Sequence, residues 1–83
     1  MNIRVRLGAG LVHLTGRPRL VIGLQEDATI ADLLDCLRVE YPALAERLDT
    51  AVPMISGRAA APAEPLTAGQ EVALLLPVAG GAK

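Results

Sequence analysis

The stretch Glu71-Val72-Ala73-Leu74-Leu75-Leu76-Pro77 decides the fold. From Val72 to Leu76 it is apolar without a break, which is the pattern of a strand buried on both faces. A strand of this kind lies in the middle of a sheet. The sequence therefore predicts a central strand over 71–77, with other strands on either side of it.

The N-terminal region predicts two further strands. Apolar residues alternate with polar ones over 2–7 and again over 20–24, the period of two that marks a strand with one buried face. The simplest pairing of the two strands is antiparallel. The connection over 8–18 is punctuated by glycine and proline but also carries several apolar residues. We therefore expect it to fold back onto the edge of the core.

The middle of the chain predicts a helix. One apolar stripe with helical spacing consists of Ile30, Leu33, Leu34, Leu37 and Tyr41. Thr29 stands at the N-cap position, and Asp32 completes a short form of the capping box at the positive end of the helix dipole. Pro42 disfavours helical geometry at the residue before it. The helix should therefore end at Tyr41, and a short second turn should follow over 43–48.

The chain after the helix predicts a short strand and a connection. We expect the strand over 51–55 to lie at an edge of the sheet, because Pro53 has no N–H to give to a central ladder. Residues 56–58 form its turn. The run 59–65, rich in alanine and proline, should cross the surface as a poorly structured connection, and 66–70 should turn into the last strand.

These elements together define one fold. A hairpin, a helix, a short strand and a central last strand give a mixed sheet with one main helix packed on one face, provided that the first strand lies beside the last. This α+β arrangement is the β-grasp. A chain of 83 residues buries one small core. We therefore expect a single β-grasp domain over 1–78 and a flexible C-terminal tail with Gly-Gly over 79–83.

The composition excludes several kinds of function. Tyr41 is the sole aromatic residue and the net charge is -1, so the chain has neither stacking platforms nor a basic stripe for nucleic acid. Cys36 is the sole cysteine and cannot alone hold a zinc ion or an iron-sulfur cluster, so we expect no bound cofactor or metal. The sequence shows no leader and no membrane span, and we expect a cytoplasmic protein that binds no membrane. Because so small a domain has little room for a large catalytic pocket, we expect a protein that acts through its surface or its ends.

The C-terminal run Val78-Ala79-Gly80-Gly81-Ala82-Lys83 is open to two interpretations. One is a frayed terminus, as at the end of most domains. In the other, Gly80 and Gly81 form a thin peptide that enters the active site of a partner, where only backbone fits. Fully extended, the five residues from Pro77 to Gly81 span about 15–18 Å, which is enough to reach a buried catalytic centre.

Three segments of the chain together resemble a known family. They are Val5-Arg6-Leu7 running into 11–16, then 29–34, then 66–81. The last is the most specific, because Gly-polar-acidic-Val, an apolar run, a proline and Gly-Gly occur in that order. The chain resembles the small sulfur-carrier family that includes the molybdopterin synthase small subunit and the thiamine-pathway sulfur carrier, which are relatives of ubiquitin. Its length and its Leu-Thr-Gly loop over 14–16 are more similar to the molybdopterin-type branch.

The resemblance implies a function for the tail. In this family an ATP-dependent activating enzyme adenylates the terminal glycine, and a persulfide or sulfide then displaces AMP. The resulting thiocarboxylate gives its sulfur to a precursor on a biosynthetic partner enzyme. Carried over, that glycine is Gly81, and Gly80 supplies clearance around an acyl carbon that two enzymes must attack. The chain would then be a sulfur-carrying cosubstrate or the small subunit of a sulfurtransferase complex.

Two features depart from the family. Its members carry an aromatic residue shortly after the first strand, where this chain has Gly8-Ala9-Gly10. In addition, Gly81 is followed by Ala82-Lys83. The resemblance therefore implies that a protease, for which a metalloprotease is a candidate, removes these two residues before activation. Without that removal the chain would be a non-functional relative.

A second candidate site is a docking patch near the root of the tail. Arg4 and Arg6 lie on the face of the first strand opposite Ile3 and Val5, and Leu75 joins them if its side chain points to the same open face. An exposed leucine beside arginines suits a reusable protein interface. The alternative is an ordinary solvated sheet face.

Other functions stay open. A ubiquitin-like modifier would join Gly81 to lysines of target proteins, and a plain interaction module would have an inert tail. Lys83 is the sole lysine, so after its removal no second copy could be joined to a lysine of this chain. The acceptor of a carried sulfur could belong to molybdopterin, thiamine, cysteine, tRNA or natural-product biosynthesis. His13 is interpreted as an exposed loop residue and Cys36 as a packing residue.

Overall fold

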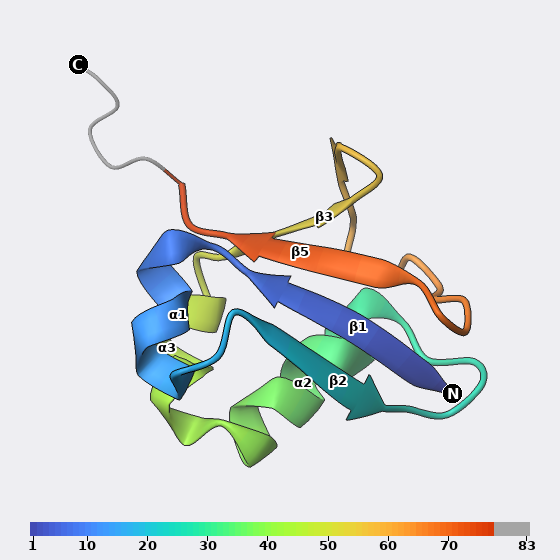
Figure 1. Cartoon of the computed structure of the whole chain (residues 1–83). Helices are drawn as coiled ribbons and strands as arrows, with labels where there is room; N and C mark the ends of the chain where they lie inside the picture. The colour runs from blue at the N-terminus through green and yellow to red at the C-terminus, as the bar shows by residue number, and fades with distance from the viewer. Residues whose placement is uncertain (78–83) are drawn as a thin grey trace.

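The computed structural model describes residues 1–77, and these form one mixed β-sheet with helices on one side (Figure 1). The strands are β1 (Asn2–Leu7), β2 (Arg19–Gly23), β3 (Val52–Ile55), β4 (Arg58–Ala59) and β5 (Glu71–Leu75). The helices are α1 (Ala9–Thr15), α2 (Ile30–Glu40) and α3 (Ala45–Leu48), with a 3-10 turn over Pro42–Leu44. The predicted α+β class and β-grasp arrangement are confirmed.

β5 is the central strand of a sheet whose order is β2-β1-β5-β3-β4. It pairs in parallel with β1, where Val5 faces Val72, and antiparallel with β3, where Met54 faces Ala73. The prediction of a central strand in the last apolar run is therefore confirmed. The strand ends at Leu75, two residues earlier than expected.

The core fills the space between the sheet and α2. β1 and β2 form the predicted antiparallel hairpin, and alternate residues of each strand face inward. The most deeply buried large side chains are Ile3, Val5, Leu11, Ile22, Ile30, Leu33, Leu37, Leu44, Leu48, Val72 and Leu74. All of them are aliphatic, and each contributes about 1.5–3 kcal/mol to stability through its burial.

α2 begins and ends where the sequence predicts. The N–H of Asp32 donates to Oγ1 of Thr29 at 3.3 Å, and the N–H of Thr29 donates to Oδ2 of Asp32 at 2.9 Å. This reciprocal pair is the capping box, which satisfies two N–H groups that the helix itself leaves free. At the other end Tyr41 is the C-cap, and Pro42 starts the 3-10 turn that leads into α3.

The connection between β1 and β2 is helical over α1, which its sequence does not predict. Gly16 ends the helix with a φ of +76°, a left-handed conformation that favours glycine. Leu11 is completely buried, so the connection does return to the core as expected. Gly10 lowers the helical propensity of α1, and burial of the apolar side of the helix overrides that preference.

β3 is not an edge strand, which corrects the expectation drawn from Pro53. Ser56 and Gly57, with φ angles of +52° and +82°, turn the chain back so that β4 pairs on the outer side of β3. The carbonyl of Pro53 accepts a hydrogen bond from the N–H of Ala60 at 2.8 Å. The N–H and C=O of one strand residue point to the same side, so the missing N–H of Pro53 faces outward and the ladder to β5 loses no donor.

The run 59–65 is held in place, which corrects the expectation of a poorly structured connection. At the start of α2, the N–H of Ile30 donates to the carbonyl of Glu64 at 3.0 Å and that of Ala31 to the carbonyl of Pro62 at 2.9 Å. The first N–H groups of a helix have no partner within the helix. The run supplies these partners and is ordered by doing so.

The remaining expectations on domain organisation concern the C-terminal end. The predicted boundary at 78 and the tail over 79–83 lie outside the described residues. Within the described part of the chain, no helix is long and apolar enough to cross a membrane.

Candidate functional site

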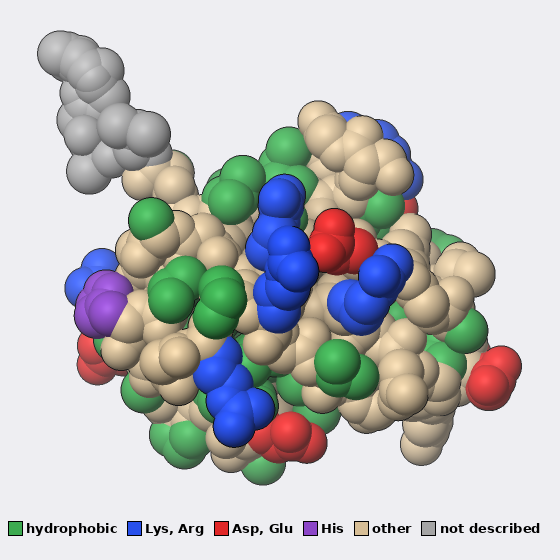
Figure 2. All heavy atoms as spheres, in the orientation of Figure 1, with side chains coloured by type: hydrophobic (Ala, Val, Ile, Leu, Met, Phe, Trp, Pro, Cys, Tyr) green, Lys and Arg blue, Asp and Glu red, His purple; other side chains and the backbone are tan. Residues whose placement is uncertain are grey.

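The sheet face turned away from α2 is the candidate docking site, and we call it the open face (Figure 2). On it, Arg4 and Arg6 of β1 lie in register with Glu71 and Ala73 of β5. Both arginines are exposed, whereas the residues that alternate with them are buried. Figure 2 shows basic side chains gathered around an acidic one on this side of the molecule. The two arginines thus lie next to the last strand, as the sequence predicts.

Leu75 belongs to the same open face. Its side chain is 41% exposed, while the adjacent Leu74 is completely buried on the opposite side of β5. Leu75 faces Val52 of β3 in register, so a neighbouring strand adds apolar surface beside it. The structure brings Leu75 and the two arginines to one face, and their role in docking stays a prediction.

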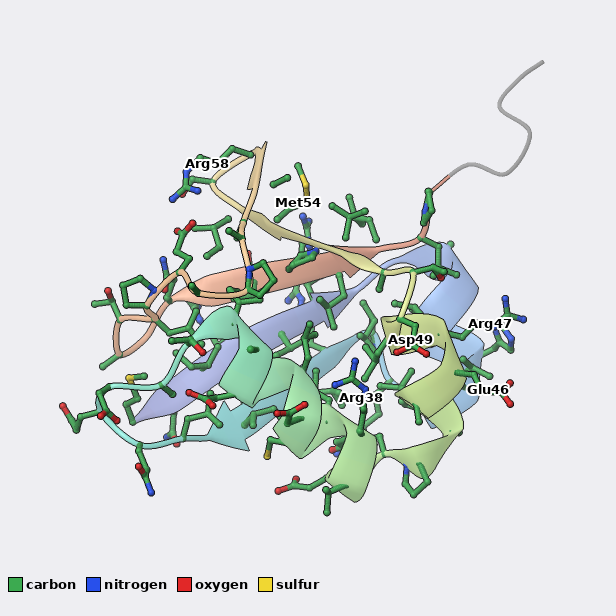
Figure 3. All side chains as sticks on the ribbon, turned by 180° about the vertical axis from the view of Figure 1, so that it is seen from behind. Arg38, Glu46, Arg47, Asp49, Met54 and Arg58 are labelled. Atoms are coloured by element: carbon green, nitrogen blue, oxygen red, sulfur yellow. The ribbon has the colours of Figure 1, made fainter. Side chains whose placement is uncertain are left out.

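A shallow hollow of about 230 Å³ lies on the open face. It is lined by Arg6, Met54, Ser56, Gly57, Glu71, Ala73 and Leu75. Met54 projects from β3 on the side away from the helices (Figure 3). A guanidinium, a carboxylate and apolar side chains therefore meet in one concave surface. This mixture is typical of contacts between proteins.

The two arginines differ in their hydrogen bonds. Nη2 of Arg4 donates to the carbonyl of Gly69 in the turn before β5, at 3.1 Å. Arg6 has no such anchor among the described residues and lines the hollow. Within residues 1–77 neither side chain lies in an ion pair. Both charges are therefore available to carboxylates of a partner.

The end of β5 packs against the start of α1. The N–H of Gly8 donates to the carbonyl of Leu74 at 2.9 Å. A Cβ at Gly10 would lie 2.7 Å from Cδ1 of Leu76, and a Cβ at Gly8 would lie 3.1 Å from Cδ2 of Leu75. A side chain at either glycine would displace one of these leucines. The two glycines therefore permit a close approach at the place where the resemblance leads one to expect an aromatic residue.

Gly80 and Gly81, the predicted carrier residues, lie outside the described residues together with Ala82 and Lys83. The last described residue, Pro77, is exposed and follows the end of β5 by two residues. The described chain therefore leads directly from the central strand into the candidate carrier segment.

Cys36 is a partly buried thiol on α2. Its Sγ donates to Oε2 of Glu40 at 3.5 Å, and burial together with this carboxylate raises the pKa of the thiol. A raised pKa keeps the sulfur protonated and weakens it as a nucleophile. Among residues 1–77, no three His, Cys, Asp or Glu side chains are placed to hold a metal ion.

Five residues of the hollow are not predicted by the sequence to belong to the site: Met54, Ser56, Gly57, Glu71 and Ala73. The first three reach it because β3 pairs with β5 and the turn after β3 returns along the sheet. Side chains alternate between the two faces along a strand, so Met54 lies on the face away from the buried Ile55. This alternation in the sequence could have indicated that Met54 belongs to the open face. The order of the strands in the sheet could not be predicted in this way, because it depends on pairing between distant segments.

The fold and the open face define a small β-grasp protein whose central strand runs into a Gly-Gly segment. The model of the ThiS family matches residues 5–81, and the chain belongs to the ThiS family. Small archaeal modifier protein 1 of Haloferax volcanii is 36% identical to it over 84 residues, which cover 92% of this chain and 97% of that protein. The predicted membership of the ubiquitin-like β-grasp family is confirmed.

Solved structures agree with this assignment. The crystal structure of SAMP1 from Haloferax volcanii superimposes with a TM-score of 0.87 at 34% identity, covering 98% of this chain and 100% of that one. Subunit 1 of the molybdopterin-converting factor from Helicobacter pylori, solved in complex with subunit 2, has a TM-score of 0.71 at 24% identity. That match covers 98% of this chain and 100% of that subunit and shows a shared fold.

Proposed function

We propose that this protein is a sulfur carrier that bears a thiocarboxylate on Gly81. A protease, for which we favour a metalloprotease, first removes Ala82 and Lys83. An ATP-dependent activating enzyme then adenylates Gly81, and the sulfur passes to a biosynthetic partner enzyme, with molybdopterin formation as the first candidate pathway. The chain is the cosubstrate in these reactions and binds no cofactor of its own, since the activating enzyme uses the ATP.

The observation that carries this proposal is the extent of the family match. It runs from residue 5 to residue 81 and so includes the Gly-Gly pair, while Ala82 and Lys83 follow it. A carrier needs a rigid body that a partner can recognise and a thin segment that reaches a catalytic centre. The described residues supply the body, and Pro77 stands four residues before Gly81.

The chemistry follows from the carboxylate of Gly81. One carboxylate oxygen attacks the α-phosphorus of ATP, pyrophosphate leaves, and a mixed anhydride with AMP forms. A hydrosulfide then adds to the acyl carbon, and AMP leaves with the bonding electrons, so that the product is the thiocarboxylate. With no Cβ on Gly81 or Gly80, the carboxylate can approach the α-phosphorus closely, and the acyl carbon is then open to the hydrosulfide.

The open face is the proposed docking surface for the partner enzymes. Arg4, Arg6 and Leu75 lie on the same sheet face as the hollow, and Leu75 is the last residue of β5 before the carrier segment. A partner enzyme bound to the open face would therefore lie close to the point where the carrier segment begins. The Helicobacter pylori relative, which shares this fold, was solved with its second subunit, and we propose a partner of that kind.

A second function, protein modification, is favoured by one comparison. The relative that is 36% identical is named small archaeal modifier protein 1. A modifier would use the same activated Gly81, with a lysine amine of a target in place of sulfur as the nucleophile. The N-terminal amine of this chain donates to the carbonyl of Leu24 at 2.6 Å, so it is engaged and poorly placed to accept a second copy.

The test of the proposed function compares two chains, one ending at Gly81 and the other at Lys83. Each is incubated with the activating enzyme, ATP and a sulfide source. We expect the chain ending at Gly81 to gain the mass of one oxygen-to-sulfur exchange in its C-terminal peptide. In this chain the terminal carboxylate belongs to Gly81, the residue that the activating enzyme adenylates. The chain ending at Lys83 should show neither this gain nor pyrophosphate exchange.

Two outcomes would contradict the proposal. Equal pyrophosphate exchange with both chains would remove the requirement for processing. A mass gain that maps to the peptide of Cys36 would assign the sulfur to the thiol and not to Gly81.

Arg6→Glu tests the docking surface. We expect the KM of the activating enzyme for the chain ending at Gly81 to rise about tenfold with kcat unchanged, because a reversed charge at a protein interface weakens encounter. The matched control is Arg47→Glu on α3, an exposed arginine on the helical side of the molecule (Figure 3). An equal rise in KM for both variants would show a general charge effect and would argue against docking at the open face.

A further inference from the structure

The outer edge of β2 carries backbone groups that no described strand pairs. β2 is the first strand in the sheet order, with β1 on one side and nothing described on the other (Figure 1). On the β1 side, the N–H of Leu7 donates to the carbonyl of Pro18 and that of Leu24 to the carbonyl of Met1, each at 2.8 Å. These two bonds fix which residues of β2 face β1.

Every second residue of an antiparallel strand bonds to the same neighbour. From Pro18 and Leu24, the alternation assigns Leu20 and Ile22 to the β1 side, where they face Val5 and Ile3 in register. The N–H and C=O groups of the intervening residues therefore point away from the sheet. These residues are Arg19, Val21 and Gly23, and all three are exposed.

The opposite edge of the sheet is protected in a way that β2 is not. β4 has two residues, and both Nη atoms of Arg58 donate to the carboxylate of Glu64 at 2.9 and 2.6 Å beside it. Figure 3 shows Arg58 at the end of the β3–β4 hairpin, remote from the helices. A short, charged edge discourages pairing with another strand. β2 is longer, and Val21 at its centre is 64% exposed.

We propose that two copies of this chain pair through β2, antiparallel and about a twofold axis at Val21, to form one continuous sheet. In this register Val21 faces Val21 of the second copy, and Arg19 faces Gly23 in both directions. Each facing pair exchanges two N–H to C=O bonds, because all three residues present their free groups outward. An interface of this kind is self-complementary, as a twofold dimer requires.

The side chains of β2 fit this register. The two exposed valines cover each other at the axis, which removes apolar surface from water. Across the interface Arg19 lies opposite Gly23, a residue without a side chain, so no two arginines face each other between the two copies. Gly23 is the last residue of β2 and has no side chain to pack, so it leaves room for the guanidinium opposite it.

Charges at the two ends of β2 favour the same orientation. Arg17 and Arg19 stand at the start of the strand, and Glu26 and Asp27 follow its end. An antiparallel partner brings the basic end of each copy beside the acidic end of the other. A parallel partner would place like charges together, which is unfavourable.

The expected association is weak and independent of sulfur transfer. Three facing residue pairs bury far less surface than the 1,200–2,000 Å² or so of a standard interface, so we expect a dissociation constant on the order of 0.1 mM. β1 separates β2 from β5, so pairing through β2 leaves Leu75 accessible on the open face. The test below therefore does not depend on the fate of Gly81.

The experiment measures amide hydrogen exchange of the full chain by NMR at about 20 μM and about 1 mM, on either side of that constant. We expect the amides of Arg19, Val21 and Gly23 to be protected only at the higher concentration. The amides of Leu20 and Ile22, which bond to β1, should be protected equally at both. Sedimentation velocity of the same samples should show the mass rising from monomer toward dimer.

Gly23→Lys supplies the matched variant. A Cβ at Gly23 would come no closer than 3.9 Å to another heavy atom, Oδ1 of Asn2, so folding should be unaffected. The new cation would face Arg19 of the second copy, and we expect the dissociation constant to rise at least about tenfold. Gly23→Ser should leave it within about twofold. Arg19→Glu combined with Gly23→Lys should restore pairing, because opposite charges then face each other.

Three results would overturn the proposal. They are a monomer at every concentration, a dimer that Gly23→Lys does not weaken, and equal protection of the three outward amides at both concentrations. If the protein is a monomer at every concentration, the free edge of β2 would instead be a candidate site for an extended segment of another protein. The second would assign self-association to a different surface of the chain.

Discussion

Changing Gly81 to valine in a chain ending at that residue is expected to slow adenylation and sulfur uptake by a factor of about 100. The β-branched side chain would crowd the acyl carbon at the step where the activating enzyme must place it against ATP, and again where sulfur attacks. A displacement of about 1 Å at a reacting centre is enough for a loss of this size. The measurement is pyrophosphate exchange, followed by the mass of the C-terminal peptide.

The stability of the Gly81→Val protein should not change. Every core side chain lies between Ile3 and Leu74, so the substitution removes no buried surface from the described core. Its urea midpoint should match that of the unsubstituted chain. Normal sulfur uptake by this variant would count against Gly81 as the carrier residue and would favour an interaction module. A shifted midpoint would mean that the rate loss cannot be assigned to crowding alone.

Leu74→Ala should lower the free energy of unfolding by about 2–5 kcal/mol. Leu74 is completely buried in the central strand, and truncation would leave a cavity that the strands on either side can only partly fill. Small domains are stable by about 5–15 kcal/mol, so this single change would remove a large part of the total. Urea unfolding followed by circular dichroism measures the difference.

Leu75→Ala is the matched control, because the two leucines are adjacent and point to opposite faces of β5. Leu75 is 41% exposed, and its truncation should cost less than about 1 kcal/mol. It should nevertheless raise the KM of the activating enzyme if the open face is the docking surface. Equal loss of stability in the two variants would contradict the assignment of Leu74 to the core and Leu75 to the open face.

Local signals in the sequence were enough for the central strand, the hairpin and α2. Thr29 and Asp32 fix the start of α2 through contacts three residues apart, and Pro42 fixes its end through its own ring. The unbroken apolar run of β5 reflects burial on both sides, so it too could be interpreted without knowledge of its neighbours. In each case the deciding interaction is local or is a simple count of apolar residues.

The missed features depend on contacts between distant segments. α1 forms despite Gly10 within it, because Leu11 enters a core built largely from other elements. The run 59–65 is ordered because it accepts hydrogen bonds from Ile30 and Ala31, about thirty residues earlier in the chain. From the sequence alone Pro53 predicts an edge strand, since nothing nearby in the chain indicates that its missing N–H faces the outer side. The hollow on the open face was missed for the same reason, as the pairing of β3 with β5 assembles it.

The central position of β5 also has a consequence for biosynthesis. During translation β1 is made first, yet its parallel partner is among the last described segments to be made, so the β1–β5 ladder cannot close early. Sheets held by such non-local pairings fold slowly, and β1 and β3 present free edges until β5 arrives. A chain interrupted before residue 71 would lack this ladder and would be exposed to aggregation or proteolysis. The sheet is therefore complete only in chains that include β5, so an activating enzyme that recognises the folded body would ignore chains that stop before it.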